Sequence, residues 1–144
     1  MAVTIDANVF IAAADERNLL HAAAQSALAR ELSSSERIVL FIPPLVAYLR
    51  VATHPLLFRR PLSLERAFEN LQAVTDLPNV SVEAHTLPFL DQLAQVARQV
   101  DARGKLIHDA EIVTLMIHHG VQRILTADRD FLKFDGIEVT LLQG

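Results

Sequence analysis

Short apolar runs alternate along this chain with longer segments in which apolar residues recur at helical spacing. Five of the short runs are rich in β-branched residues and are bounded by turn-forming residues, a pattern typical of buried strands. These predicted strands cover residues 3–5, 38–42, 80–82, 123–125 and 137–141.

The segments between the predicted strands favour helices, over residues 21–32, 64–74, 89–100 and about 108–119. Ser63 is placed to cap the first turn of the second of these helices, and Pro88 suits the first helical position of the third. Gly120 follows the fourth, where a glycine commonly forms a left-handed cap.

Strands that alternate with helices predict βαβ units and a mostly parallel sheet with helices on its faces. The length of 144 residues is that of one domain, which can bury a core without disulfides or a structural metal. We therefore expect one α/β domain over residues 1–144, a three-layer sandwich around a central sheet of about five strands.

The composition excludes several classes of protein. Without Cys, the chain has no disulfide framework, thiolate catalysis or Cys-ligated metal cluster. No run approaches the roughly 20 apolar residues of a membrane span, and the first residues lack a signal peptide, so we expect a cytoplasmic protein with no membrane partner. The net charge of −4 argues against nucleic-acid binding through bulk charge.

Acidic residues follow two of the predicted strands. Asp6 comes directly after the first strand, Asp128 and Asp130 follow the fourth, and Asp109 is expected in the first turn of the helix over residues 108–119. Ligands of parallel sheets bind beyond the carboxyl ends of the strands. Carboxylates that meet there need a cation, and oxygen ligands favour Mg²⁺ or Mn²⁺, which suits phosphate chemistry.

The same four aspartates also have a purely structural interpretation. Each lies at or near a predicted helix start, where a carboxylate caps free N–H groups and complements the helix dipole. Spacing along the chain does not distinguish the two interpretations, because convergence depends on the order of the strands.

Three segments carry a resemblance to a known family: DANVF at residues 6–10, DA at residues 109–110, and TADRDF at residues 126–131. Together they resemble a PIN domain, and residues 43–51 and 134–137 are similar to that family too. The likeness covers nearly the whole chain in the right order. It is strongest to the VapC-type toxin ribonucleases of type II toxin–antitoxin pairs.

This resemblance implies a PIN-like fold and a Mg²⁺- or Mn²⁺-dependent endoribonuclease that hydrolyses RNA phosphodiesters. It also implies a small cognate antitoxin as partner and a homodimer. The catalytic residues carried over by position are four acids: Asp6, Asp109, Asp128 and Asp130. The first two would be the principal metal ligands, Asp128 would complete the metal site directly or through water, and Asp130 would support it. Asn8 and Thr126 match positions that hold the carboxylates in place.

One position departs from the family pattern. The family normally carries a Glu on the helix after the second strand, three residues before the position of Arg50, and Ala47 stands there in this chain. Water can replace a protein ligand of Mg²⁺, so this change does not by itself imply lost activity. The alternative is a catalytically weakened PIN domain that binds RNA or a protein partner without cutting.

A different class of phosphate chemistry would also place an Asp at a strand end, as in receiver or haloacid dehalogenase proteins. Such a protein needs a second acid near that Asp and a Lys near a late strand. Asn8 lies two residues after Asp6, and neither Lys is suitably placed. The sequence therefore disfavours this alternative.

Basic residues surround the predicted acidic site. The charges between residues 42 and 64 are all positive, and a basic rim around a metal pocket suits a phosphodiester substrate. We expect RNA contacts from four residues: Arg50, Arg103, Lys105 and Arg129. The alternative for each is a solvated face on which the long stems cover apolar surface.

Residues 9–32 and 45–58 carry more large apolar side chains than a small core requires. They include Phe10, Leu19, Leu20, Leu45, Val46, Tyr48, Leu49, Leu56, Leu57 and Phe58. We expect this surplus to form a groove for a second copy of the chain or an antitoxin segment, the alternative being ordinary core packing.

Overall fold

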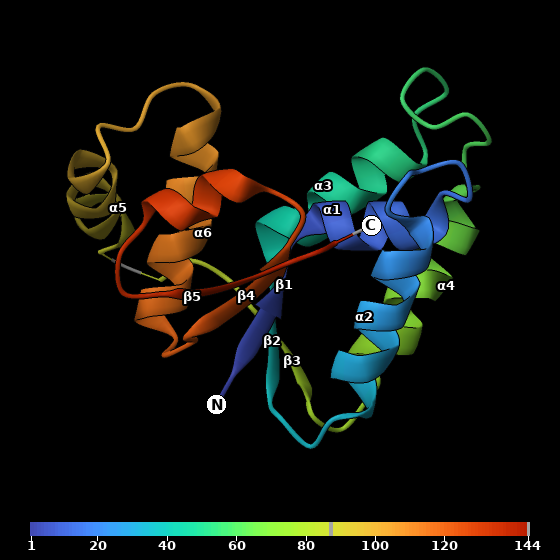
Figure 1. Ribbon diagram of the computed structural model, residues 1–144, viewed down its shortest axis with the longest axis horizontal. Helices are drawn as coiled ribbons and strands as arrows, with labels where there is room; N and C mark the ends of the chain where they lie inside the picture. The colour runs from blue at the N-terminus through green and yellow to red at the C-terminus, as the bar shows by residue number, and fades with distance from the viewer. Residues whose placement is uncertain (87, 144) are drawn as a thin grey trace.

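The computed structural model describes residues 1–86 and 88–143 and has a five-stranded parallel sheet at its centre (Figure 1). The strands are β1 (Val3–Ile5), β2 (Ile38–Phe41), β3 (Val80–Glu83), β4 (Arg123–Thr126) and β5 (Glu138–Leu141). All neighbouring strands pair in parallel, in the order β3-β2-β1-β4-β5. The predicted number and direction of the strands are confirmed.

Helices cover both faces of this sheet (Figure 1). Those described are α1 (Ala7–Ala14), α2 (His21–Ser33), α3 (Ile42–Ala52), α4 (Leu64–Thr75), α5 (Phe89–Gln99), α6 (Lys105–His118) and the 3₁₀-helix η1 (Arg129–Lys133). None of the helices described is long and apolar enough to cross a membrane.

The two faces of the sheet bury two separate cores. Side chains alternate along β2, so Ile38 and Leu40 pack under α1–α4 while Val39 and Phe41 pack under α5 and α6. A parallel sheet covered on both faces needs apolar side chains on both, which explains why the strand sequences lack a polar face. The predicted three-layer sandwich is confirmed.

The order of the strands creates a crevice between β1 and β4. The chain runs outward from β1 through β2 to β3 and then returns to the other side of β1 to form β4 and β5. Open parallel sheets bind ligands at such a reversal, beyond the carboxyl ends of the strands. Asp6 and Asp128 follow the two strands that flank it.

The predicted start of α6 is wrong by three residues. The helix begins at Lys105, so Asp109 is its fifth residue and lies in the second turn rather than the first. Gly104 has a φ of 57°, which a glycine adopts without strain, and the chain turns into the helix there. The predicted end is correct: Gly120 has a φ of 68°, and the N–H of Val121 donates to the carbonyl of Met116 at 2.8 Å.

Two other boundaries differ slightly from prediction. Ile42 begins α3 instead of ending β2, because Pro43 and Pro44 hold the backbone in the helical range and suit the first turn. Pro88 immediately precedes α5 instead of occupying its first position. Ser63 does cap α4, where its Oγ accepts from the N–H of Arg66 at 3.1 Å.

The surplus apolar side chains divide between core and surface. Phe10, Leu45, Tyr48 and Phe58 are buried under α1–α4, as core packing requires. Leu19, Val46, Leu56 and Leu57 are exposed. Several of these side chains are therefore exposed and others pack in the core, and the groove stays a prediction.

Candidate metal centre

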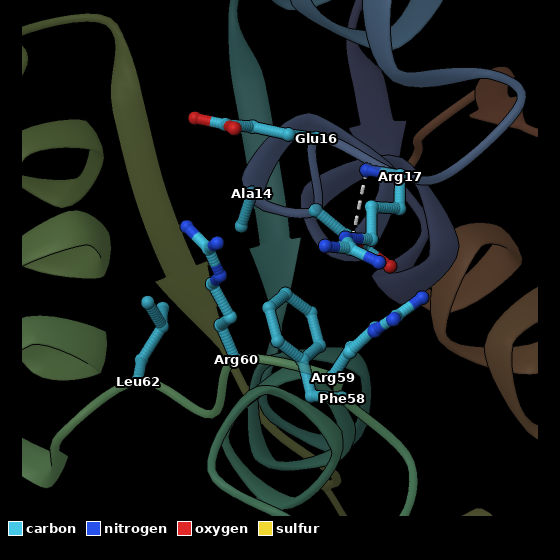
Figure 2. A pocket seen from close by; sticks show the side chains of 8 residues that line it. Ala14, Glu16, Arg17, Phe58, Arg59, Arg60 and Leu62 are labelled. Carbon is cyan, nitrogen blue, oxygen red and sulfur yellow. Dashed lines mark hydrogen bonds between the residues drawn. The ribbon is translucent and has the colours of Figure 1, made fainter.

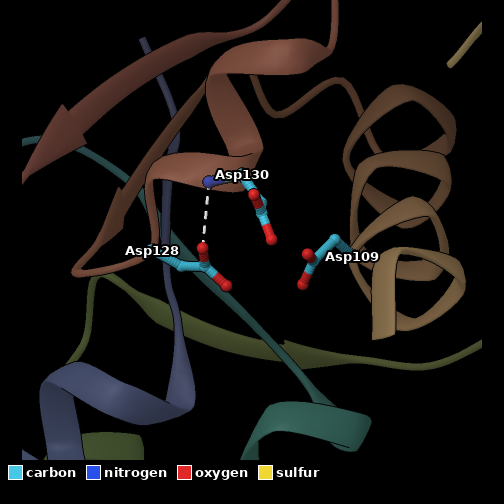
Figure 3. A group of neighbouring side chains, drawn as sticks. All are labelled: Asp109, Asp128 and Asp130. Carbon is cyan, nitrogen blue, oxygen red and sulfur yellow. Dashed lines mark hydrogen bonds between the residues drawn. The ribbon is translucent and has the colours of Figure 1, made fainter. Parts of the chain in front are cut away.

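Three aspartates meet at the carboxyl edge of the sheet. One carboxylate oxygen from each of Asp109, Asp128 and Asp130 lies within 4.8 Å of the other two. Figure 3 shows the Asp109 side chain projecting from α6 toward the two that follow β4. The order of the strands thus brings together residues that spacing alone could not place.

Asp109 is the most deeply buried of the three. Only 3% of the residue is exposed, and its Oδ2 accepts no hydrogen bond from the residues that the structure describes. Burial raises the pKa of this carboxyl group to about 6; Lys105 lowers it, while the negative charges of Asp128, Asp6 and Asp130 raise it further. A buried carboxylate oxygen without a donor is costly, and a cation would satisfy it.

Lys105 supplies a positive charge to the cluster. Its Nζ pairs with Oδ2 of Asp128 and lies 3.9 Å from Oδ2 of Asp109 and 3.8 Å from Oδ2 of Asp130. The predicted RNA contact of Lys105 stays a prediction, but in this structure its ammonium group faces three carboxylates. A positive charge at the first position of a helix interacts unfavourably with the helix dipole. The favourable interactions of Lys105 are therefore those with the three carboxylates.

The Lys105 contact also changes the protonation of Asp128. Burial by itself raises the pKa of the Asp128 carboxyl group, but the hydrogen bonds from Lys105 and from the N–H of Asp130 bring it below its usual value. The same bond to Asp128 raises the pKa of Lys105. At neutral pH, this edge of the sheet therefore holds a charged pair beside the less acidic Asp109.

Asp6 is not one of the three clustered acids. Its Oδ1 accepts from the N–H of Ala7 at 2.8 Å, and its Oδ2 accepts from Thr126 Oγ1 at 2.8 Å and from Asn8 Nδ2 at 3.2 Å. Burial raises the pKa of this carboxyl group, and the charge of Asp128 adds to the effect. Asp6 thus caps α1 and also borders the cluster. Its position is compatible with both helix capping and a place in a metal site.

Asn8 and Thr126 join the ends of β1 and β4. Thr126 Oγ1 donates to Asp6 and accepts from the N–H of Asp128 at 3.0 Å. Asn8 Oδ1 accepts from the N–H of Ala127 at 3.1 Å, while its Nδ2 donates to both Asp6 and Thr126. These bonds fix Asp6 and the backbone that carries Asp128 relative to one another.

Asp128 and Asp130 are held by η1. Asp128 Oδ1 caps this helix by accepting from the N–H of Asp130 at 2.9 Å, as the dashed line in Figure 3 marks. The Asp130 side chain is 40% exposed and its Oδ1 lies 3.3 Å from Lys133 Nζ. Asp130 is therefore the most accessible of the three clustered acids.

The remaining predicted residues lie on α3, in the loop before α6 and in η1. Ala47 is the sixth residue of α3 and half-buried, and α3 contains no acidic residue. Arg50 and Arg129 are exposed, whereas Arg103 pairs with Asp101 at 3.2 Å. The four predicted RNA contacts are thus exposed, and their role in binding RNA stays a prediction.

Sequence reasoning missed the contact between Lys105 and the acids. A signal for it exists, because Lys105 and Asp109 are four residues apart and share one face of a helix. A helix predicted to begin at residue 108 excludes Lys105 and so hides this signal.

Comparison with known proteins shows the family to which this chain belongs. The family model described as PIN domain matches residues 3–137 of this chain. The chain is 37% identical over 139 residues to Ribonuclease VapC48 of Mycobacterium tuberculosis, covering 96% of each chain. It is 30% identical over 133 residues to Ribonuclease VapC37 of the same organism, covering 92% of each. The chain belongs to the PIN domain family.

Solved structures share the same fold. The sarcin–ricin loop cleaving toxin VapC20 of Mycobacterium tuberculosis aligns with a TM-score of 0.69 and 19% identity, over 94% of this chain and 98% of that one. VapBC2 from Rickettsia felis, bound to a DNA fragment from its promoter, aligns with a TM-score of 0.70 and 10% identity, over 99% of this chain and 100% of that one.

Proposed function

We propose that this protein is the toxin of a toxin–antitoxin pair and acts as a metal-dependent endoribonuclease. One observation carries the metal site: three carboxylates converge at the β1–β4 crevice, and one of their oxygens is buried without a donor. The relatives named as ribonucleases cover nearly the whole chain, which supports RNA cleavage as the reaction.

The residues present fit a hard divalent cation. Asp6 and Asp109 would be the principal ligands of Mg²⁺ or Mn²⁺, Asp128 would complete the site directly or through water, and Asp130 would support them. When bound, such an ion neutralises charge on the phosphodiester and acidifies water. Asn8 and Thr126 keep Asp6 oriented, and Lys105 must leave the carboxylates to admit the ion.

The absence of a Glu at position 47 does not remove this site. The three clustered carboxylates come from α6 and the region after β4, and none comes from α3. The ribonuclease names of the relatives favour a cutting enzyme over a PIN domain that only binds.

RNA is the proposed substrate, and a small antitoxin and a second copy of the chain are the proposed partners. Exposed apolar side chains at Val46, Leu56 and Leu57 support a protein partner on α3 and the loop after it. Light scattering on the protein purified alone tests for the homodimer: a monomer without a co-purifying small protein contradicts this proposal.

The experiment for the whole proposal compares RNA cleavage with Mg²⁺, with Mn²⁺ and with EDTA. Asp109→Asn should abolish both cleavage and toxicity to the producing cell, and so should Asp6→Asn. Asp91→Asn is the matched control, since Asp91 is exposed on α5 and outside the cluster. Full toxicity in either active-site variant would reject the metal assignment.

A further inference from the structure

A hollow of about 250 Å³ lies at the end of α1 opposite Asp6 (Figure 2). Arg17, in the loop after α1, and Arg59 and Arg60, in the loop between α3 and α4, line this hollow. The ring of Phe58 lies between the Arg59 and Arg60 side chains and is buried at its base.

The three arginines of the hollow have no acidic partner in the described chain. Arginine ion pairs there involve only Arg66, Arg103 and Arg123. Two acids also line the hollow, which leaves its lining with a net charge of +1. One of them, Asp15, accepts from the N–H of Arg17 at 3.1 Å. The other, Glu16, extends its carboxylate to the side on which Arg60 lies (Figure 2), and no ion pair joins these two side chains in the described residues.

This chemistry suits a phosphate group. One guanidinium group can donate two parallel hydrogen bonds to the oxygens of a phosphate, and it stays charged at every physiological pH. The chain as a whole is acidic, so a polyanion needs local sites of this kind to bind it.

The position of the hollow favours RNA over an acidic protein segment. α1 begins beside the metal centre, at Asp6, and its 8 residues span about 12 Å before the hollow begins. α3 packs beside α1 (Figure 1) and carries the exposed Arg50 in its last turn. A single strand whose scissile phosphate lies at the acidic cluster can therefore reach the hollow within a few nucleotides.

We propose that Arg17, Arg59 and Arg60 form a subsite for a backbone phosphate of single-stranded RNA, a few nucleotides from the bond that is cut. The subsite rests on the proposed ribonuclease function and extends it. It adds three residues to the four expected to touch RNA, and it contributes to affinity without taking part in the cleavage step.

The test measures RNA binding without cleavage. A fluorescein-labelled single-stranded RNA of twelve nucleotides is titrated with the full chain in EDTA, at KCl concentrations from 50 to 200 mM, and anisotropy is recorded. The variant is Arg59→Gln with Arg60→Gln. The matched control is Arg66→Gln with Arg98→Gln, which removes the same charge from exposed positions on α4 and α5.

The variant with Arg59→Gln and Arg60→Gln should bind RNA about tenfold more weakly at low salt. A plot of its log affinity against log salt concentration should also be less steep, and the slope should change by about 0.7 for each phosphate that the protein no longer neutralises. The control should change little. Equal losses of affinity in both would overturn the subsite in favour of bulk charge. Unchanged RNA binding together with loss of binding to a poly-aspartate peptide would overturn it in favour of a protein segment. Because binding is read in EDTA, a failure of RNA cleavage in Mg²⁺ is seen separately.

Discussion

The ammonium group of Lys105 lies 3.9 Å from Oδ2 of Asp109, the buried oxygen that accepts no hydrogen bond. Both residues belong to α6, one turn apart. A charge carried by the chain itself thus stands where a metal ion would have to bind, and the two cations compete for the same oxygens.

Replacing Lys105 by Met should therefore tighten Mn²⁺ binding by about tenfold, because the ion no longer displaces a positive charge. Titration calorimetry on the metal-free protein measures the affinity. Arg103→Met is the control, since Arg103 lies two residues away and pairs with Asp101 instead of with the clustered acids. Weaker binding in Lys105→Met would show that Lys105 assists the ion instead of competing with it.

Asp109 makes the stability of the metal-free protein depend on pH. Its folded pKa of about 6 lies above the unfolded value of 3.8, so the folded state holds the proton more tightly. Stability is then greatest below the unfolded pKa and falls as the pH rises to about 6, by up to about 3 kcal/mol. Asp109→Asn removes the ionised form and should stabilise the protein at pH 8.

Urea unfolding in EDTA at several pH values tests this dependence. The gain in unfolding free energy of Asp109→Asn should shrink as the pH falls below 6, where the wild-type carboxyl group is protonated. A gain that is the same at pH 5 and pH 8 would mean that the charge of Asp109 carries no cost.

Ala47 gives a test of the missing acid. Ala47→Glu should raise Mn²⁺ affinity by roughly tenfold, because a further carboxylate adds charge to the site. Val46→Glu introduces the same charge at a neighbouring position of α3 that is 55% exposed and faces a different direction. If both variants gain equally, the effect is long-range charge, and position 47 has no special relation to the metal centre.

Far from the carboxyl edge, Arg123 of β4 forms a bidentate pair with Glu31 of α2, at 2.8 and 2.9 Å. Both side chains are largely buried, so Arg123→Met should cost about 3–5 kcal/mol of unfolding free energy by leaving Glu31 charged and unpaired. Adding Glu31→Gln should restore part of the stability. Arg66→Met, which breaks an exposed pair with Glu69, should cost less than about 1 kcal/mol in the same denaturant titration.

The sequence predicts those features that depend on local pattern. β-branched runs locate all five strands, and Ser63 and Gly120 mark helix ends correctly, because capping and turn chemistry act over a few residues. The start of α6 escapes such reasoning, because Gly104 provides no capping side chain and Lys105 opposes the helix dipole.

Contacts between distant segments could not be predicted in the same way. That Asp109 meets Asp128 depends on the order of the strands, which spacing does not reveal. The sequence suggests that Lys105 faces RNA, and only the packing of α6 against η1 shows that it faces acids. The ion pair between Arg123 and Glu31 joins residues 92 positions apart, and the sequence around each residue does not indicate its partner.

The bonds from Thr126 to Asp6 and from the N–H of Ala127 to Asn8 join residues about 120 positions apart, at the two flanks of the crevice. During synthesis on the ribosome, β1 emerges first but lacks one neighbour until β4 has been made. Asp6 then stays without its Thr126 donor until residue 126 has been translated. The candidate centre can therefore form only after residue 130 has been made, so a chain interrupted before that point would lack it.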